Sequence, residues 1–186
     1  MNKKQTAVTV LLLSLMFLLA ITQSFFGNKF SRVSVTENTI EFKEYEFENY
    51  TAELPDKWTV SEEEIKDGYI SYNIKFKSED KFITGLVQVI NTKDDIKNYA
   101  ENDIKKQSLE YHNSEITPFE NSESIGVLAK YDTNIKNGGN YINKCYYIKG
   151  INGQIIKMLF NISEGHYTKE LDNTCLEIAS SIKYNK

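Results

Sequence analysis

Apolar and polar positions alternate along most of the chain beyond residue 38, which is the pattern of half-buried β-strands. This alternation predicts eight strands, over residues 38–47, 49–55, 68–77, 82–92, 114–120, 124–135, 140–150 and 154–163. The letters SEDK at 78–81 are typical of a turn. The strands on either side of this turn are therefore expected to form an antiparallel hairpin.

The apolar spacing changes to that of an amphipathic α-helix in two segments, 92–110 and 166–184. Thr92 is expected to cap the N-terminus of the first helix. The apolar stripe of this helix consists of Ile96, Tyr99, Ala100 and Ile104. The stripe of the second helix consists of Leu171, Cys175, Ile178 and Ile182.

The turn between the last two strands sets the expected register of their hairpin. Asn152-Gly153 favours a two-residue type I′ turn, which would place Cys145 opposite Phe160. Apolar side chains would then lie on both faces of the hairpin, so both faces need a cover. This pattern predicts an α+β fold, an α/β/α sandwich with a central antiparallel β-sheet, in a domain formed by residues 39–186.

The N-terminal segment, MNKKQTAVTVLLLSLMFLLAITQSFFGNK, is uncharged from Gln5 to Gly27. As a helix, residues 6–26 would span roughly 30 Å, the thickness of the hydrocarbon core of a bilayer. Lys3 and Lys4 favour a cytoplasmic N-terminus. We therefore expect residues 1–27 to be a single transmembrane helix and residues 28–38 a polar tether. A cleaved signal segment is the alternative, although the apolar run is long and the cleavage-site residues are weak.

One turn contains the only tryptophan and one of the two prolines of the chain. Pro55 lacks an amide donor and holds Leu54 extended, so it ends a strand. Trp58 then presents an apolar surface on the order of 200 Å². This pattern predicts a structural turn with an aromatic plug at one end of the core. An exposed tryptophan in a ligand groove is the alternative interpretation.

The same stretch, YTAELPDKW at 50–58, resembles the strand-Pro-x-x-Trp entry of the PsbP-like family. The later order of elements is also similar to that family: a strand pair, a helix at DDIKNYAENDIKK, a run of antiparallel strands and a terminal helix ending in IASSIKY. The resemblance covers residues 40–184. It implies an α/β/α sandwich and a role in binding or assembly, and it transfers no functional residue to this chain.

Charge and composition limit the class of partner. The whole chain carries −4 and its first 32 residues carry +4, so residues 33–186 carry −8. An acidic domain is a poor ligand for phosphate backbones, and we expect no nucleic-acid partner. Few alanines and many Asn, Lys, Ile and Tyr residues suggest an AT-rich bacterial source.

The sequence contains no recognised catalytic or metal-binding motif. His112 and His166 stand far apart and have no Cys or His at ligand spacing, so no metal site is expected. Asp132 and Asn134 fit the first positions of a calcium loop, but the later positions do not, and a hairpin turn is the favoured interpretation. SEEE at 61–64 is interpreted as a helical turn capped by Ser61 rather than as a cation site.

Cys145 and Cys175 are the only cysteines. With the expected register, Cys145 lies on the face of Phe160, and the last helix could bring Cys175 to the same face. A disulfide is then possible outside the cytoplasm. The alternative is a pair of buried free thiols.

These observations predict a non-catalytic protein without a cofactor, anchored in the cell membrane of a bacterium. Its domain would lie outside the cytoplasm and bind, or help to assemble, another envelope protein. The alternative is a secreted or tethered carrier of a small ligand or lipid, because twelve tyrosines and ten phenylalanines could line a groove.

Overall fold

The structure is a computed structural model that describes residues 40–65, 68–107, 109–122, 124–136 and 138–185. The predicted membrane segment and tether, residues 1–38, lie outside these ranges. Within the described ranges, no helix has both the length and the apolar character needed to cross a bilayer.

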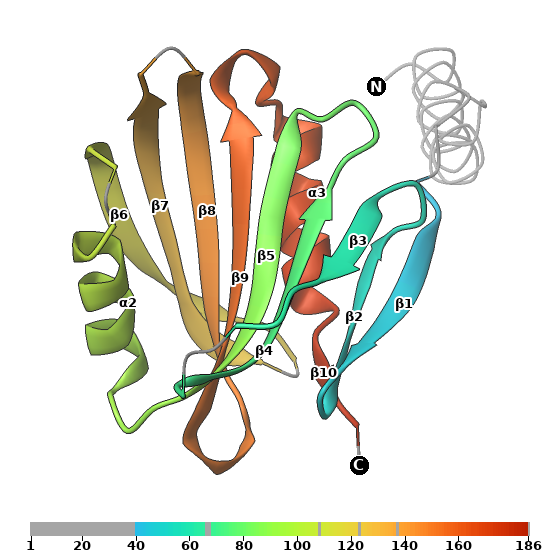
Figure 1. The fold of residues 1–186 in the computed structure, drawn as a ribbon, viewed down its shortest axis with the longest axis vertical. Coiled ribbons are helices and arrows are strands. Elements are labelled where there is room, and N and C mark those ends of the chain that lie inside the picture. Colours follow the sequence, from blue (N-terminus) through green and yellow to red (C-terminus); the bar gives the residue numbers. More distant parts are fainter. Residues whose placement is uncertain (1–39, 66–67, 108, 123, 137, 186) are drawn as a thin grey trace, which may run out of the picture. The chain divides into compact units, whose positions relative to one another are not determined.

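Ten strands and two α-helices make up the described domain (Figure 1). The strands are β1 (Phe42–Phe47), β2 (Tyr50–Pro55), β3 (Thr59–Glu62), β4 (Ile70–Lys77), β5 (Ile83–Asn91), β6 (Tyr111–Glu120), β7 (Ile125–Ile135), β8 (Gly139–Lys149), β9 (Gln154–Ser163) and β10 (Lys183–Tyr184). The helices are α2 (Ile96–Lys105) and α3 (Lys169–Ser180), with short 3₁₀ turns η1 (Ile151–Gly153) and η2 (Glu164–His166).

The strands form two antiparallel sheets. Seven strands make the main sheet in the order β3-β4-β5-β9-β8-β7-β6, and β1-β2-β10 make a smaller sheet. Strands β4 and β5 pair as the predicted hairpin, with Ile74 opposite Val87. Pro118 lies in β6, an outer strand, which is where a residue without an amide donor is tolerated in a sheet.

The two faces of the main sheet have separate apolar cores. Tyr147 of β8 belongs to a core cluster that also contains Ile104 of α2. Its neighbour Tyr146 belongs to the other cluster, which contains Ile178 of α3 and residues of the small sheet. Successive residues of a strand point to opposite faces, so the two helices lie on opposite faces of the sheet. The α+β fold and the antiparallel sheet are as predicted.

The predicted register of the last hairpin is wrong by one residue. Cys145 pairs with Leu159, and Phe160 pairs with Lys144. The turn is a three-residue one, Ile151–Gly153, in which Asn152 adopts a left-handed conformation with φ 53° and ψ 28°. A one-residue slip exchanges the two faces of a strand, so Cys145 lies on the face opposite to Phe160.

Two local predictions also differ from the structure. Ser61, expected to cap a helical turn, lies in strand β3 opposite Lys75, because this segment pairs with β4. The N-cap of α2 is Asp95, whose carboxylate accepts from the backbone amide of Lys97 at 3.0 Å. Thr92 instead accepts from the amide of Asp94 at 3.1 Å, one turn before the helix begins.

Gly85 is a position where the sheet has no room for a side chain. A Cβ atom there would lie 2.3 Å from the ring of Phe76 and 2.1 Å from the carbonyl oxygen of Leu159. We expect Gly85→Ala to lower the free energy of unfolding by about 1–3 kcal/mol, because the crowded core would have to shift. Denaturant unfolding of the full-length protein, followed by Trp58 fluorescence, measures the change. Gly165→Ala is the control, since that site is open, and equal effects of the two variants would contradict the prediction.

Candidate functional site

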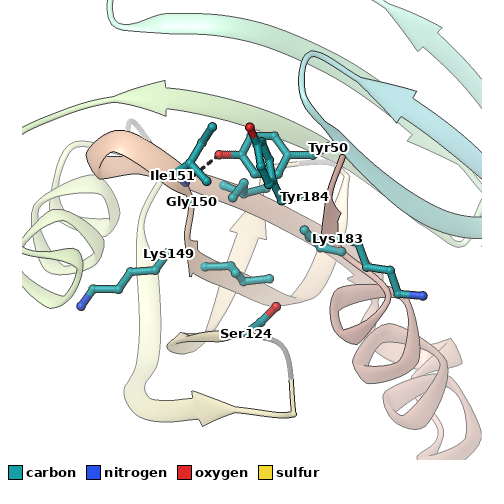
Figure 2. A pocket seen from close by; sticks show the side chains of 10 residues that line it. Tyr50, Ser124, Lys149, Gly150, Ile151, Lys183 and Tyr184 are labelled. Carbon is teal, nitrogen blue, oxygen red and sulfur yellow. Dashed lines mark hydrogen bonds between the residues drawn. The ribbon is translucent and has the colours of Figure 1, made fainter. Parts of the chain in front are cut away.

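A groove of about 630 Å³ lies at one end of the domain (Figure 2). It is formed where the β8–β9 turn, strand β10, the start of β2 and the β6–β7 loop approach one another. The lining residues are Tyr50, Ser124, Ile148, Lys149, Gly150, Ile151, Ile156, Ile182, Lys183 and Tyr184. These residues come from four separate parts of the chain, so only the folded domain has this site.

One wall of the groove is held by hydrogen bonds. The hydroxyl of Tyr50 accepts from the backbone amide of Ile151 at 2.9 Å and donates to the side-chain carbonyl of Gln154 at 2.8 Å. Burial raises the pKa of Tyr50, so the hydroxyl keeps its proton and both bonds. A Cβ atom at position 150 would lie 2.5 Å from the Tyr50 oxygen, so Gly150 makes room for this contact.

The floor of the groove is apolar and its rim is partly aromatic. Ile148, Ile156 and Ile182 are at least 97% buried and form the floor. Tyr184 is 46% exposed, and its ring packs edge-on against Tyr50 with 5.9 Å between centroids. Solvent reaches the apolar lining mainly at Tyr184 and at the partly exposed Ile151, while the floor is closed off by its neighbours.

The charged residues that line the groove are both lysines, and one acidic residue, Glu48, lies close to the wall formed by Tyr50 and Gln154. Among the ten described residues that line it, Lys149 and Lys183 carry charge and no acidic residue does. Figure 2 shows their amino groups at opposite sides of the groove, pointing outward. This local charge is opposite to that of residues 33–186 as a whole, which carry −8.

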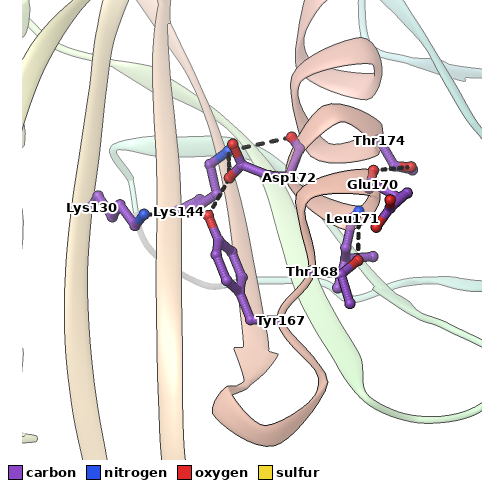
Figure 3. Close-up of polar contacts among 8 residues, drawn as sticks. All are labelled: Lys130, Lys144, Tyr167, Thr168, Glu170, Leu171, Asp172 and Thr174. Carbon is purple, nitrogen blue, oxygen red and sulfur yellow. Dashed lines mark hydrogen bonds and ion pairs between the residues drawn. The ribbon is translucent and has the colours of Figure 1, made fainter.

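Helix α3, which leads into the groove at Ile182 and β10, is fixed to the sheet by a half-buried ion pair (Figure 3). The ammonium of Lys144, whose side chain is 4% exposed, lies 2.6 Å from a carboxylate oxygen of Asp172. The hydroxyl of Tyr167 donates to the same oxygen and accepts from Lys130 at 3.2 Å. Burial acts to raise the pKa of Asp172, but the hydrogen bonds from Lys144 and Tyr167 outweigh it, so the pKa lies below its usual range.

The end of α3 is joined to the small sheet by Ser181. Its hydroxyl accepts from the backbone amide of Glu53 at 2.8 Å and donates to the carbonyl of Ile178 at 2.7 Å. Lys183 and Tyr184 then pair with Thr51 and Tyr50 of β2. The position of the groove wall therefore depends on how α3 is held.

A second polar cluster holds α2 on the other face. The carboxylate of Asp103 lies 2.7 Å from the ammonium of Lys157 and accepts from the hydroxyl of Tyr147 at 2.6 Å. Burial, followed by the nearby charges, raises the pKa of Tyr147, so the phenol stays protonated. These groups bond to one another beneath the helix, which indicates a structural role.

The two cysteines are free thiols in different core clusters. Cys145 packs in the cluster of α2 and Cys175 in the cluster of α3, and both are buried. The possible disulfide depended on the predicted register, which placed Cys145 on the other face of the sheet; two buried thiols were the alternative. Burial raises the pKa of each thiol to about 12.

The Pro55–Trp58 turn lies at the edge of the core and outside the groove lining. The amide of Trp58 donates to the carbonyl of Pro55 at 2.9 Å. The indole is half-buried and stacks on the ring of Phe76, with 5.4 Å between centroids. The tryptophan thus covers one part of the core without being enclosed by it.

The two histidines, and the residues Asp132 and Asn134 that partly fit a calcium loop, lie outside the groove lining. His112 is exposed on β6. His166, at the end of η2, stacks on the ring of Phe82. Asp132 and Asn134 lie in β7, which continues into the β7–β8 hairpin, as the favoured interpretation predicted. Within the described ranges, no group of three or more His, Cys, Asp and Glu side chains is placed to hold a metal ion.

Comparison with known proteins gives the class of the fold. No family model and no curated protein matches the sequence. Among solved structures, the cyanobacterial PsbP (CyanoP) of Synechocystis sp. PCC 6803 is similar over 81% of this chain and 96% of its own, with a TM-score of 0.56 and 9% identity. A protein of Bacteroides thetaiotaomicron is similar over 74% of this chain and 46% of its own, with a TM-score of 0.49 and 14% identity.

The antiparallel α+β domain described here therefore has a PsbP-like fold. The predicted family resemblance is confirmed at the level of the fold. At 9% identity the likeness says nothing about which residues bind a partner. Sequence patterns also missed the groove, because its lysines and tyrosines are ordinary surface residues until the chain is folded.

We expect acid to weaken the attachment of α3. The pKa of Asp172 is lower in the folded state than in the unfolded state, so its contribution to stability is present above the unfolded pKa of about 4 and is lost as the pH falls through the folded value. Asp172→Asn should lower the free energy of unfolding at pH 7 by about 1–3 kcal/mol. This loss is smaller than the loss on breaking a fully buried ion pair, because the Asp172 side chain is 40% exposed.

Denaturant unfolding of the full-length protein in detergent between pH 7 and pH 3, followed by Trp58 fluorescence, measures both effects. The variant should lose less stability than the wild type over this range. Glu177→Gln, an exposed change on the same helix, is the control. A variant with the wild-type pH profile would contradict this role of Asp172.

The thiols are expected to be unreactive in the folded protein. With a pKa of about 12, Cys145 and Cys175 have almost no thiolate at pH 8 and no access to solvent. In denaturant, a chromogenic thiol reagent should therefore detect two thiols per chain. In the absence of denaturant, the same reagent should react with these thiols about 100-fold more slowly or slower still. Detection of no thiol in denaturant, with an intact mass 2 Da lower, would instead show the disulfide.

Proposed function

We propose that this protein is a membrane-tethered accessory or assembly protein of the bacterial cell envelope, which acts by binding and not by catalysis. The observation that carries the proposal is the groove, a preorganised surface that combines the exposed apolar residues Ile151 and Tyr184 with two lysines. The proposed tether is the N-terminal segment, whose long uncharged run follows Lys3 and Lys4.

The chain enters the described domain at the end of the β1–β2 hairpin that lies away from the groove. Tyr50 of the groove pairs with Phe47 at the end of β1, whereas the chain enters that strand at Phe42. Phe42 and Phe47 are five residues apart along the strand, which is about 17 Å of extended chain. Attachment through the N-terminus thus joins the domain at the end of this hairpin opposite to the groove.

The ionisable groups of the core support binding over catalysis. Asp172 and Asp103 are each committed to a lysine and to a tyrosine hydroxyl. The two thiols have raised pKa values and are buried, which is the opposite of an activated nucleophile.

A carrier of a small ligand is the second candidate. The groove volume of about 630 Å³ lies within the range of small-molecule sites. Against this candidate, the largest aromatic residues of the core, Tyr131, Tyr146 and Tyr147, are fully buried among other side chains and do not line the groove.

Site-specific photo-cross-linking of the full-length protein in its native membrane tests the proposal. A photoreactive amino acid replaces Tyr184 in the groove, which is 46% exposed, or Ile135 at the far end of the sheet, which is 38% exposed. We expect a discrete protein adduct from position 184 that is absent from position 135, with the product in the membrane fraction. No adduct at 184, the same adducts at both positions, or a protein in the soluble fraction would contradict it.

A further inference from the structure

We infer that the groove binds an extended acidic peptide segment of a partner protein. An aliphatic side chain of the segment lies against Ile151 and Tyr184, and its carboxylates lie beside Lys149 and Lys183. This inference rests on the proposed function, because it names the chemistry of the partner at the same site.

The distribution of charge favours a segment with several carboxylates. A domain region with a net charge of −8 repels acidic partners in general, so a groove whose charged residues are both lysines selects acidic ligands at this place. The two amino groups lie at opposite sides of the groove and point outward (Figure 2). Two separated positive charges match carboxylates spaced along a chain better than one compact head group.

The backbone at the groove favours an extended segment. Strand β10 is an outer strand of the small sheet, and both of its residues, Lys183 and Tyr184, line the groove. In the described part of the chain, β10 pairs with β2 alone. An outer strand leaves amide and carbonyl groups that a peptide in extended conformation can meet, while alternate side chains of the peptide enter pockets.

The apolar part of the groove suits an aliphatic anchor. Above the buried isoleucines of the floor, Ile151 is partly exposed and Tyr184 is 46% exposed, and these two side chains offer the contact surface. The bonds of Tyr50 to Ile151 and Gln154 hold the wall in place before binding, which lowers the entropic cost of association.

The test uses a display library of random dodecapeptides, selected on the full-length protein in detergent. We expect enriched sequences in which one Ile, Leu or Val is flanked by Asp or Glu. A synthetic fluorescent peptide of the enriched sequence then gives the dissociation constant by anisotropy. This dissociation constant should rise at least tenfold in the double variant Lys149→Glu/Lys183→Glu. For the wild-type protein it should rise with the salt concentration.

The matched control is Lys77→Glu with Lys136→Glu, which changes the net charge equally at two exposed lysines outside the groove lining. It should change the dissociation constant less than twofold. Thermal unfolding of both variants checks that each is folded. If a charge-reversal variant does not fold, Lys149→Gln with Lys183→Gln replaces it, with an expected rise of at least fivefold.

Three outcomes would overturn the inference. The first is a library that yields no enriched sequence. The second is an enriched sequence that binds both double variants equally well. The third is a groove that binds oleate or phosphatidylglycerol vesicles but no peptide. If position 184 gives a protein adduct and one of these outcomes is also seen, the proposed function is kept and only the inference of an acidic peptide ligand is rejected. Loss of the adduct itself would remove the proposed function.

Discussion

The three-residue turn at Ile151–Gly153 is the constraint on which the rest of the domain depends. It sets the register of β8 on β9, at the centre of the main sheet, and so assigns every side chain of these strands to one face or the other. Tyr146 and Ile148 consequently face α3, and Tyr147 faces α2. The same turn brings Ile151 to the hydroxyl of Tyr50, so the wall of the groove follows from the register as well.

The two faces hold their helices in the same way. On each face a lysine of a central strand reaches an aspartate of the helix, and a tyrosine hydroxyl donates to the same carboxylate. Helices of ten and twelve residues bury few apolar side chains each. A buried ion pair adds little net stability, but leaving one partner unpaired is costly, so the pair favours a single position for each helix. That position fixes Ile182 and β10, and with them the floor and rim of the groove.

Local patterns predicted the elements of this fold well, because burial on one face imposes a period on the sequence. The alternation at 68–77 and the stripe at Leu171 to Ile182 identify β4 and α3 with small errors at the ends. The register of β8 on β9 was mispredicted because Asn152-Gly153 suits a three-residue turn as well as a two-residue one. In the three-residue turn, both residues have positive φ angles. Strand β3 was missed since its pattern is polar, and it is recognised only by its pairing with β4.

The groove could not be predicted for a different reason. Lys149 and Lys183 end one strand and begin another, and neither position has a periodic signal. Their significance arises from the fold, which brings two lysines and four isoleucines together in an otherwise acidic domain. A PsbP-like protein with 9% identity shares the sheet and the helices, which depend on apolar spacing. The charges at the end of the sheet are free to change while that spacing is kept, so one fold can present different surfaces to different partners.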